Sequence, residues 1–442
     1  MKFMFLHNMS SGLRYGMVVV AVSFIAGITT AASLDVARFG KELAFTTSGY
    51  DGSSELEHLP VLVRLSEEIP GFAYADVGAT VSDVYGSLRF ADDSGTSLDY
   101  EVECWNTSGE SVVWVSLPRL DGRNVKFTAY WSVRSNSALP EVFPTNVWIS
   151  AGYVGVWHFT NTSSDKKYIP DATGRDARLV ASANNDSIGG VGSTVDSFPQ
   201  GIREKKESAN GTPFRLAAWP RLSAANTSDW TFSLTGYSTE VWYNSHGLGS
   251  TANSYIFASA ARTKCGADVE WNPHNGIQVY ERHAYLVPTK VVSSDGAATN
   301  IVQVFSTRSP HWADEATNCW HWLSAVWPPV GSDRTAVLYE GGEDYDGELR
   351  QLATHSSVVH AIDFTAPPDA LPDAVFNGAM GIVGGADNSG TANICCDEAR
   401  VRRGISSKDW IQANWDTQRV GSDFLTAGTV KVRNLAFFII VR

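Results

Sequence analysis

Two strand-like segments that lie more than 200 residues apart constrain the fold of this chain most strongly. The first, residues 152–159, is rich in aromatic and β-branched residues, which favour strands, and Asp171 follows it in a turn. The second, residues 397–403, leads into a short helix, because Ser406 stands three residues before Asp409 at a capping-box spacing. We expect the two segments to lie side by side as the opening and closing strands of one β-sandwich.

Short strands also dominate the rest of the chain. Val125, Phe127, Ala129 and Trp131 alternate with more polar residues, which is the period of two expected for a strand with one buried face. Helical periodicity is scarce, and 43% of the 442 residues are hydrophobic, enough to bury sizeable cores. These features predict an all-β protein of two β-sandwich domains.

The order of several separated segments carries a resemblance to a known family. The segments are residues 152–159, 229–233, 319–326, 338–342 and 397–403. This series resembles the laminin-G-like (LamG-like) members of the concanavalin A-like lectin and glucanase superfamily, over residues 148–425. The resemblance implies a jelly-roll sandwich, although the stretch 251–310 is longer than the family's usual middle segment.

A second resemblance lies upstream. Its segments are residues 59–65, 87–92, 98–103 and 113–118. They are similar to an uncharacterised bacterial family, the domain of unknown function 2341 (DUF2341), which commonly precedes a laminin-G-like sandwich in surface and envelope proteins. The resemblance implies a smaller β-sandwich over residues 33–140.

Apolar segments stand near both ends of the chain. Lys2 and Arg14 precede an apolar run from Met17 to Ile28, and small residues follow up to Ala32, so we expect residues 1–32 to be a secretory signal peptide. That run is short for a membrane span of about 20 residues, so we expect no transmembrane insertion after cleavage. Residues 426–442 form a C-terminal tail that we expect to hold a strand. The predicted location is outside the cell or in the envelope, in the periplasm or at the cell surface.

Charge and motifs argue against two classes of function. The formal net charge is −13, which disfavours nucleic acid and anionic membranes as partners. The Glu-x-Asp-x-x-Glu strand of the superfamily's glucanases and the Gly-x-Ser-x-Gly elbow are both missing from the sequence. Glu101 and Glu103 share a strand face, which we expect at a solvent-facing edge, and we expect His158 and His321 to be hydrogen-bonded structural residues. We therefore expect no catalytic site.

A calcium site is predicted from two aspartates. Ca²⁺ prefers carboxylate and carbonyl oxygens on irregular loops, and in the superfamily such ions often stabilise the sandwich rim. Asp171, after the first strand, and Asp397, at the start of the closing strand, are expected to approach each other because their strands should be neighbours. The alternative is an ordinary turn residue and a strand-end residue.

Aromatic residues supply the candidate ligand-binding positions. Exposed Trp rings form flat platforms for sugar rings, and Trp242 and Trp312 lie where this is possible. The other candidates are expected in cores: Trp157, Trp230, Trp320 and Trp322.

These observations favour an exported, non-catalytic binding protein with a LamG-like lectin module that recognises a glycan or a cell-surface protein. Two alternatives remain: a polysaccharide-active glycoside hydrolase, and a structural component of a cell-envelope assembly. The five cysteines allow disulfides in an oxidising compartment, for example Cys265 with Cys319, but the sequence does not fix their pairing.

Overall fold

The protein is all-β in the described part of the chain, and every named strand pair is antiparallel. The computed structural model describes residues 33–135, 137–159, 168–175, 179–180, 202–203, 236–245, 254–265, 268–280, 283–287, 304–305, 320–328, 336–342, 348–355, 379–382, 394–419 and 421–433. The expected signal segment, residues 229–233 and Trp312 lie outside these ranges. Among the described residues, no helix is long and apolar enough to cross a membrane.

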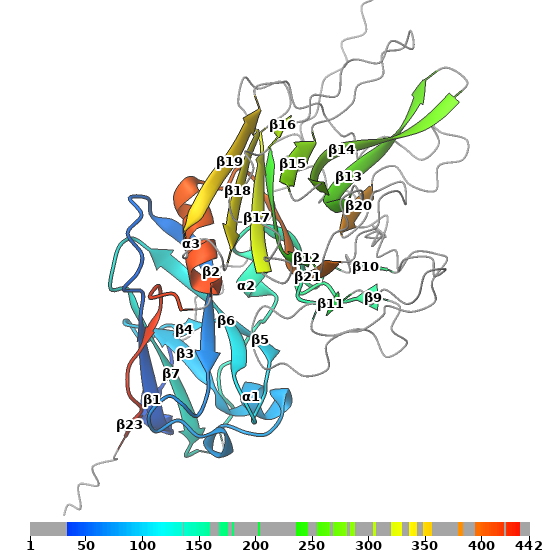
Figure 1. The fold of residues 1–442 in the computed structure, drawn as a ribbon. Helices are drawn as coiled ribbons and strands as arrows, with labels where there is room; N and C mark the ends of the chain where they lie inside the picture. The colour runs from blue at the N-terminus through cyan, green and yellow to red at the C-terminus, as the bar shows by residue number, and fades with distance from the viewer. Residues whose placement is uncertain are drawn as a thin grey trace, which may run out of the picture.

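Two sheets form an N-terminal sandwich (Figure 1). One sheet has the order β22-β1-β7-β3-β4, with β23 also paired to β1, and the other has the order β2-β6-β5. The strands are β1 Phe39–Thr46, β2 Leu56–Leu65, β3 Arg89–Asp92, β4 Ser97–Leu98, β5 Tyr100–Cys104, β6 Ser111–Leu120, β7 Lys126–Val133, β22 Thr426–Ala427 and β23 Lys431–Val432. Short helices η1 Val36–Arg38, η2 Tyr74–Asp76 and α1 Val81–Ser87 connect or flank them.

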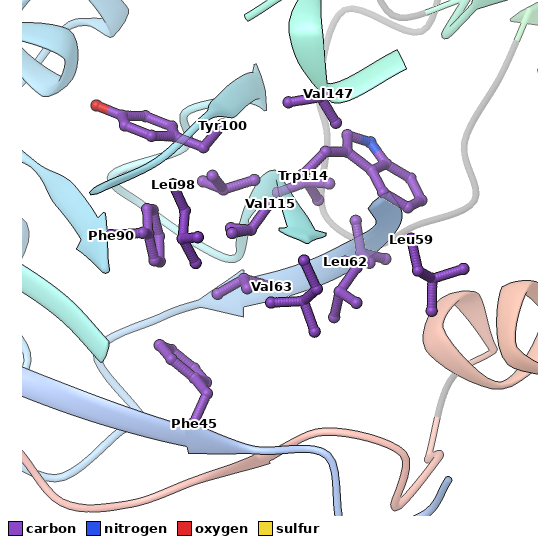
Figure 2. Close-up of a cluster of buried hydrophobic side chains, with 14 of the residues drawn as sticks. Phe45, Leu59, Leu62, Val63, Phe90, Leu98, Tyr100, Trp114, Val115 and Val147 are labelled. Atoms are coloured by element: carbon purple, nitrogen blue, oxygen red, sulfur yellow. The ribbon is translucent and has the colours of Figure 1, made fainter. Parts of the chain in front are cut away.

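Alternation along the strands builds the core of this sandwich. Phe127, Ala129 and Trp131 of β7 are buried, as the period of two predicted. The rings of Phe90 and Tyr100 bridge the two sheets with centroids 5.1 Å apart, and Figure 2 shows both in the same apolar cluster. Burying such a face drives the packing of one sheet on the other.

Two further sheets form the C-terminal region. One has the order β11-β21-β12-β17-β18-β19, with β8 paired to β21, and the other has the order β16-β15-β14-β13-β20. Their strands, with the separate pair β9 and β10, are β8 Tyr153–Trp157, β9 Tyr168–Ile169, β10 Leu179–Val180, β11 Ile202–Arg203, β12 Tyr237–Ser245, β13 Ser254–Cys265, β14 Asp268–Tyr280, β15 His283–Val287, β16 Val304–Phe305, β17 Trp320–Trp327, β18 Ala336–Gly342, β19 Leu349–His355, β20 Ala379–Ile382 and β21 Ile394–Arg403. Strands β15 and β16 of the second sheet lie against β18 and β19 of the first.

The expected pairing of the opening and closing strands is confirmed. Ala399 of β21 is in register with Trp157 of β8, and Val401 with Gly155. The helix expected after β21 is also present as α3, Lys408–Gln418. Its N-cap is Ser407, which accepts a hydrogen bond from the Trp410 N–H, so the prediction of Ser406 was wrong by one residue.

Helix α3 joins the two parts of the molecule, and Figure 1 shows it beside β2. The Leu62 N–H donates to Thr417 Oγ1 at 2.9 Å, and Arg64 donates to the Gln418 carbonyl at 2.7 Å. Trp410, Ile411 and Trp415, the predicted apolar face, are buried. They belong to the same hydrophobic cluster as the core residues of the N-terminal sandwich.

The last described residues return to the N-terminal sandwich. Phe45 of β1 pairs with Ala427 of β22, and Lys41 pairs with Val432 of β23. The segment that we treated as a tail therefore supplies two short strands to the sheet in which the described chain begins.

Candidate functional site

A cavity of about 270 Å³ lies at the junction of the two parts of the molecule. Strand β5 forms one wall, and the others are formed by the end of β9, by residues that follow β8 and β9, and by Pro144 and Thr145. The polar residues that line it are Glu101, Glu103, Thr145, His158 and Asp171, and apolar ones include Val102, Pro144, Phe159, Ile169 and Pro170. Its volume is near the lower end of the range for small-ligand pockets, about 300–1,000 Å³.

One histidine connects the two parts at this cavity. His158 directly follows β8, and its Nδ1 makes a hydrogen bond with Glu398 Oε1 of the neighbouring strand β21. Its Nε2 lies 3.2 Å from Glu101 Oε2, and its Nδ1 lies 3.7 Å from Glu103 Oε2, both on β5. A single imidazole thus contacts carboxylates from both parts of the chain. His158 is hydrogen-bonded, as the sequence led us to expect.

Each of the three carboxylates is also held by a second donor. Trp114 Nε1 on β6 donates to Glu103 Oε2 at 2.7 Å, and Arg400 Nε on β21 donates to Glu398 Oε2 at 2.8 Å. Glu101 Oε2 accepts from Nε1 of Trp148, which lies in α2 (Asn146–Ile149). These donors fix the orientation of the acidic groups before any ligand arrives.

Arg400 carries the network deeper into the molecule. Its guanidinium lies over the rings of Trp114 and Trp148, at 4.2 and 4.8 Å from their centroids. Its Nη1 is 3.9 Å from Glu240 Oε2, and the Tyr153 hydroxyl donates to the Glu240 carboxylate at 3.3 Å. Arg400 and Glu240 are buried, so the arginine offsets negative charge that water cannot reach.

Local backbone geometry places the acidic side chains. Glu101 and Glu103 are two apart on β5 and therefore share a face. Glu398 has φ of 47° and lies where the pairing of β12 with β21 shifts register, between Glu240 and Trp242. Phe159, next to His158, has φ of 56°. Left-handed backbone at non-glycine residues costs about 1–3 kcal/mol each and often marks functional sites.

Burial and neighbouring charges separate the pKa values of the network. Burial raises the pKa of Glu103 well above its usual value, and repulsion from Glu398 adds to the shift. Burial alone would lower the pKa of His158, but attraction to Glu398 and Glu101 outweighs it and raises that pKa well above its usual value. The pKa of Glu398 is lowered, because His158 and Arg400 outweigh the effect of burial. Burial and neighbouring charge therefore shift the pKa values of Glu103 and Glu398 in opposite directions, although both side chains are buried.

The two predicted metal ligands lie near this network. Asp171 lines the cavity, and its carboxylate accepts hydrogen bonds from the Val156 N–H at 3.1 Å and from the Thr173 N–H and hydroxyl at 3.0 and 2.6 Å. Asp397 is fully buried on β21, accepts from the Glu398 N–H, and raises the pKa of Glu103 through its charge. Asp171 thus stabilises the turn in which it lies. A calcium ion between Asp171 and Asp397 stays a prediction.

The predicted sugar platform at Trp242 is not exposed. Its side chain is buried and stacks on Trp415, with centroids 5.3 Å apart. Its Nε1 donates to Gln418 Oε1 at 2.8 Å. The prediction of an exposed platform at Trp242 is therefore wrong. Helix α3 covers this face of β12, and Trp242 attaches the helix to the sheet. Trp157 and Trp322 are buried as expected, and Trp320 is partly buried.

Sequence reasoning missed the residues that matter most here. Glu103 was expected to face solvent, but its exposed fraction is 8% because the C-terminal region covers that edge of β5. Glu398 and Arg400 were not singled out at all. The available signal was a pair of charged residues at a spacing of two on a strand, which puts both on one face, at Glu101 with Glu103 and at Glu398 with Arg400.

Comparisons with known proteins leave the family open. No family model and no curated protein matches the chain, so neither the DUF2341 nor the LamG-like resemblance has that support. Among solved structures, the binding domain of botulinum neurotoxin DC is similar in a complex with SialylT (TM-score 0.36, 8% identity) and in one with rat synaptotagmin II (0.37, 8%). Each of these matches covers 61% of this chain and 52% of the toxin chain.

A Trypanosoma rangeli sialidase is also similar, with a TM-score of 0.34, 10% identity, and coverage of 64% of this chain and 35% of that one. The chain therefore spans about half of the toxin structures and less of the sialidase. At these scores the likenesses are distant, and the chemistry of the cavity has to carry the functional argument.

Proposed function

We propose that this protein is an exported, non-catalytic binding protein that takes a hydroxyl-rich ligand, such as the end of a glycan, into the cavity at the junction. The observation that carries the proposal is the wall of the cavity, which combines the hydrogen-bonding groups of Glu101, Glu103 and His158 with apolar residues. Carboxylates accept hydrogen bonds from sugar hydroxyls, and the apolar residues suit the C–H face of a ring.

The charged residues of the cavity wall favour some classes of ligand over others. Glu101, Glu103 and Asp171 line the cavity together with one imidazole, His158, so an acidic ligand meets more acidic than basic groups there. A volume of about 270 Å³ suits a single terminal sugar rather than several. Neutral and amino sugars are therefore the favoured ligands, and acidic sugars are disfavoured.

Calorimetry of the protein with neutral, amino and acidic mono- and oligosaccharides tests this proposal. The informative variant is Glu101→Gln, because Glu101 lines the cavity and its side chain is partly exposed, at 16%. Loss of a charged acceptor predicts affinity lower by about tenfold or more. Glu57→Gln, at an exposed position of β2, is the matched control and should bind as the parent does.

Two results would count against a glycan ligand. Retention of no sugar by the folded protein is one, and equal affinity of the Glu101→Gln variant is the other. If the protein instead captures an envelope protein and no sugar, the structural role in a cell-envelope assembly becomes the better hypothesis.

A second candidate function, glycoside hydrolysis, is favoured by one specific observation. Glu101 and Glu103 line the same cavity, and burial raises the pKa of Glu103, as in a general acid that must hold its proton near neutral pH. Turnover of a panel of glycans, reduced about 100-fold or more in a Glu103→Gln variant, would establish this activity. Absence of turnover, or turnover that this variant leaves unchanged, would exclude a catalytic role for Glu103.

A further inference from the structure

We propose that His158, Glu103 and Glu398 form a binding site for a divalent transition-metal cation, for which zinc is the natural probe. The site is separate from the calcium ion predicted at Asp171 and Asp397. It also goes beyond the proposed function, because it stands whether or not a sugar enters the cavity.

The first argument is the convergence of ligand atoms. One nitrogen of His158 and one carboxylate oxygen each from Glu103 and Glu398 all lie within 4.8 Å of one another. Zinc bonds of about 2.0–2.2 Å place neighbouring ligand atoms roughly 3.4 Å apart in a tetrahedral site. The 3.7 Å between His158 Nδ1 and Glu103 Oε2 is close to that value. An ion would replace the direct hydrogen bond between His158 and Glu398.

The second argument is the orientation of the imidazole. Glu101 Oε2 lies 3.2 Å from His158 Nε2, so the proton on Nε2 can be donated to Glu101. An ion that binds Nδ1 would displace its proton to solvent, and the Nδ1 lone pair would then point to the ion between Glu103 and Glu398. A carboxylate behind the second nitrogen is the usual support of a metal-binding histidine. Glu101 is therefore a positioning residue in this site.

The third argument is the way the two carboxylates are held. Arg400 binds Glu398 through Oε2, which leaves Oε1 on the side of His158. Trp114 donates to Glu103 Oε2, the same oxygen that lies 3.7 Å from His158 Nδ1, and so holds this carboxylate toward the imidazole. Both carboxylates are therefore oriented toward His158 by donors that an ion would not have to displace.

The fourth argument is the balance of charge around the cluster. The acidic side chains in mutual contact or Coulomb interaction are Glu101, Glu103, Glu240, Asp397 and Glu398. The basic side chains that face them are His158, Arg400 and Arg402. A divalent cation would offset the excess of carboxylates in a place where water does so poorly.

The ligand set also selects the kind of ion. A histidine nitrogen with carboxylates suits zinc, manganese or iron(II), whereas Ca²⁺ and Mg²⁺ prefer oxygen ligands alone. Three protein ligands leave at least one coordination position free. Because His158 and Glu103 both line the cavity, we expect that position to face the cavity, where a ligand oxygen can reach it.

Titration of the metal-stripped chain with zinc, followed by calorimetry and by metal analysis after gel filtration, tests the site. We expect one zinc ion per chain at this site, bound at least tenfold more tightly than Ca²⁺ or Mg²⁺. Cobalt(II) in place of zinc should give visible d–d absorption that reports nitrogen and oxygen ligands directly. This readout does not depend on any activity.

Two variants and one control decide the assignment. His158→Gln should lose the cobalt spectrum and bind zinc at least 100-fold more weakly, and Glu101→Gln should bind it about 10- to 100-fold more weakly. Glu110→Gln, in a half-buried ion pair with Arg64 away from the cavity, should bind as the parent does. If His158→Gln does not fold, Glu101→Gln decides alone.

Three outcomes would overturn the proposal. They are no zinc bound by the folded parent chain, zinc bound with the same affinity by the folded Glu101→Gln variant, and Ca²⁺ bound more tightly than zinc.

Discussion

At the scale of single residues, the junction depends on one buried arginine. Arg400 is 1% exposed, binds Glu398 and lies near Glu240, so its removal takes a buried cation from two buried carboxylates and leaves them only His158 and Arg402 nearby. Breaking a buried pair in this way costs about 3–5 kcal/mol. We therefore predict that Arg400→Leu lowers the free energy of unfolding by about that amount in urea denaturation.

The matched control for that prediction is Arg119→Leu. Arg119 also forms ion pairs, with Glu55 and Asp121, but its side chain is 62% exposed. Exposed pairs contribute about 0–1 kcal/mol, so this variant should be nearly as stable as the parent. Equal losses in both variants would show that burial of Arg400 does not matter.

A glycine contact offers a second prediction at this scale. A Cβ added at Gly341 of β18 would lie 2.7 Å from the ring of Trp415, so the sheet and α3 would have to move apart. Overpacking of this kind costs about 1–3 kcal/mol. Gly341→Ala should therefore lower the midpoint of thermal unfolding.

The same change from glycine to alanine should stabilise the protein at Gly86. Gly86 lies inside α1, and an added Cβ there meets no atom within 4 Å. Alanine is preferred to glycine in a helix by roughly 0.5–1 kcal/mol, so Gly86→Ala should raise the midpoint. Parallel melting curves of the two variants check both signs.

At the scale of elements, the attachment of α3 should depend on pH. Asp409 in its first turn accepts hydrogen bonds from the backbone N–H groups of Ser53, at 3.0 Å, and Ser54, at 2.7 Å. Hydrogen bonds to Ser54 and Ser53 outweigh desolvation and lower the pKa of Asp409. A group whose pKa is lower when folded stabilises the folded state above its unfolded pKa, and the effect disappears as the pH falls through the folded pKa.

The variant Asp409→Asn separates this effect from general acid unfolding. The parent should be more stable than the variant near pH 6, and the difference should shrink as the pH falls below the ordinary range of an aspartate pKa. Denaturation at several pH values measures it. A difference that is constant with pH would mean that the charge of Asp409 does not contribute.

At the scale of the whole molecule, the two parts should unfold together. One hydrophobic cluster runs from the core of the N-terminal sandwich through Trp114 and Trp148 to Trp415 of α3. Strands β22 and β23 also return to β1 from the far end of the chain. Neither part can lose its packing without exposing apolar surface on the other.

We predict a single calorimetric transition whose calorimetric and van't Hoff enthalpies agree. Trp148→Ala, which removes the indole that contacts Trp114, Tyr153 and His158, should lower the stability of both parts at once. Two resolved transitions in the parent protein would show that the parts are energetically independent.

Much of the fold could be predicted because it depends on local patterns. The alternation at Phe127, Ala129 and Trp131 reports directly which face of β7 is buried, and the aromatic residues before His158 predict strand β8. Its pairing with β21 was expected because the terminal strands of a sandwich lie side by side. The predicted helix cap was wrong by one residue. Ser406 is held at β12 instead, because its N–H donates a hydrogen bond to Ser238 Oγ of that strand. Local sequence cannot report a tertiary contact of that kind.

The candidate site was largely beyond such reasoning. Glu103 and Glu398 lie almost 300 residues apart, and nothing in either segment reveals that His158 lies between them. A carboxylate on a strand has the same sequence signature whether it faces solvent or another domain. The prediction that Trp242 is exposed was wrong for a similar reason, because helix α3, from near the end of the described chain, covers it.

The sequence by itself therefore determined the class of secondary structure and the faces of the strands, since these follow from side-chain periodicity. The pairing of the strands at the start and end of the C-terminal region was expected because the two segments look like the terminal strands of one sandwich. Only the tertiary structure decided which charges became buried. Packing the C-terminal region on β5 and β6 removed water from Glu103, Glu398 and Arg400 together, and in a medium of low dielectric constant such groups need one another, a proton or a cation.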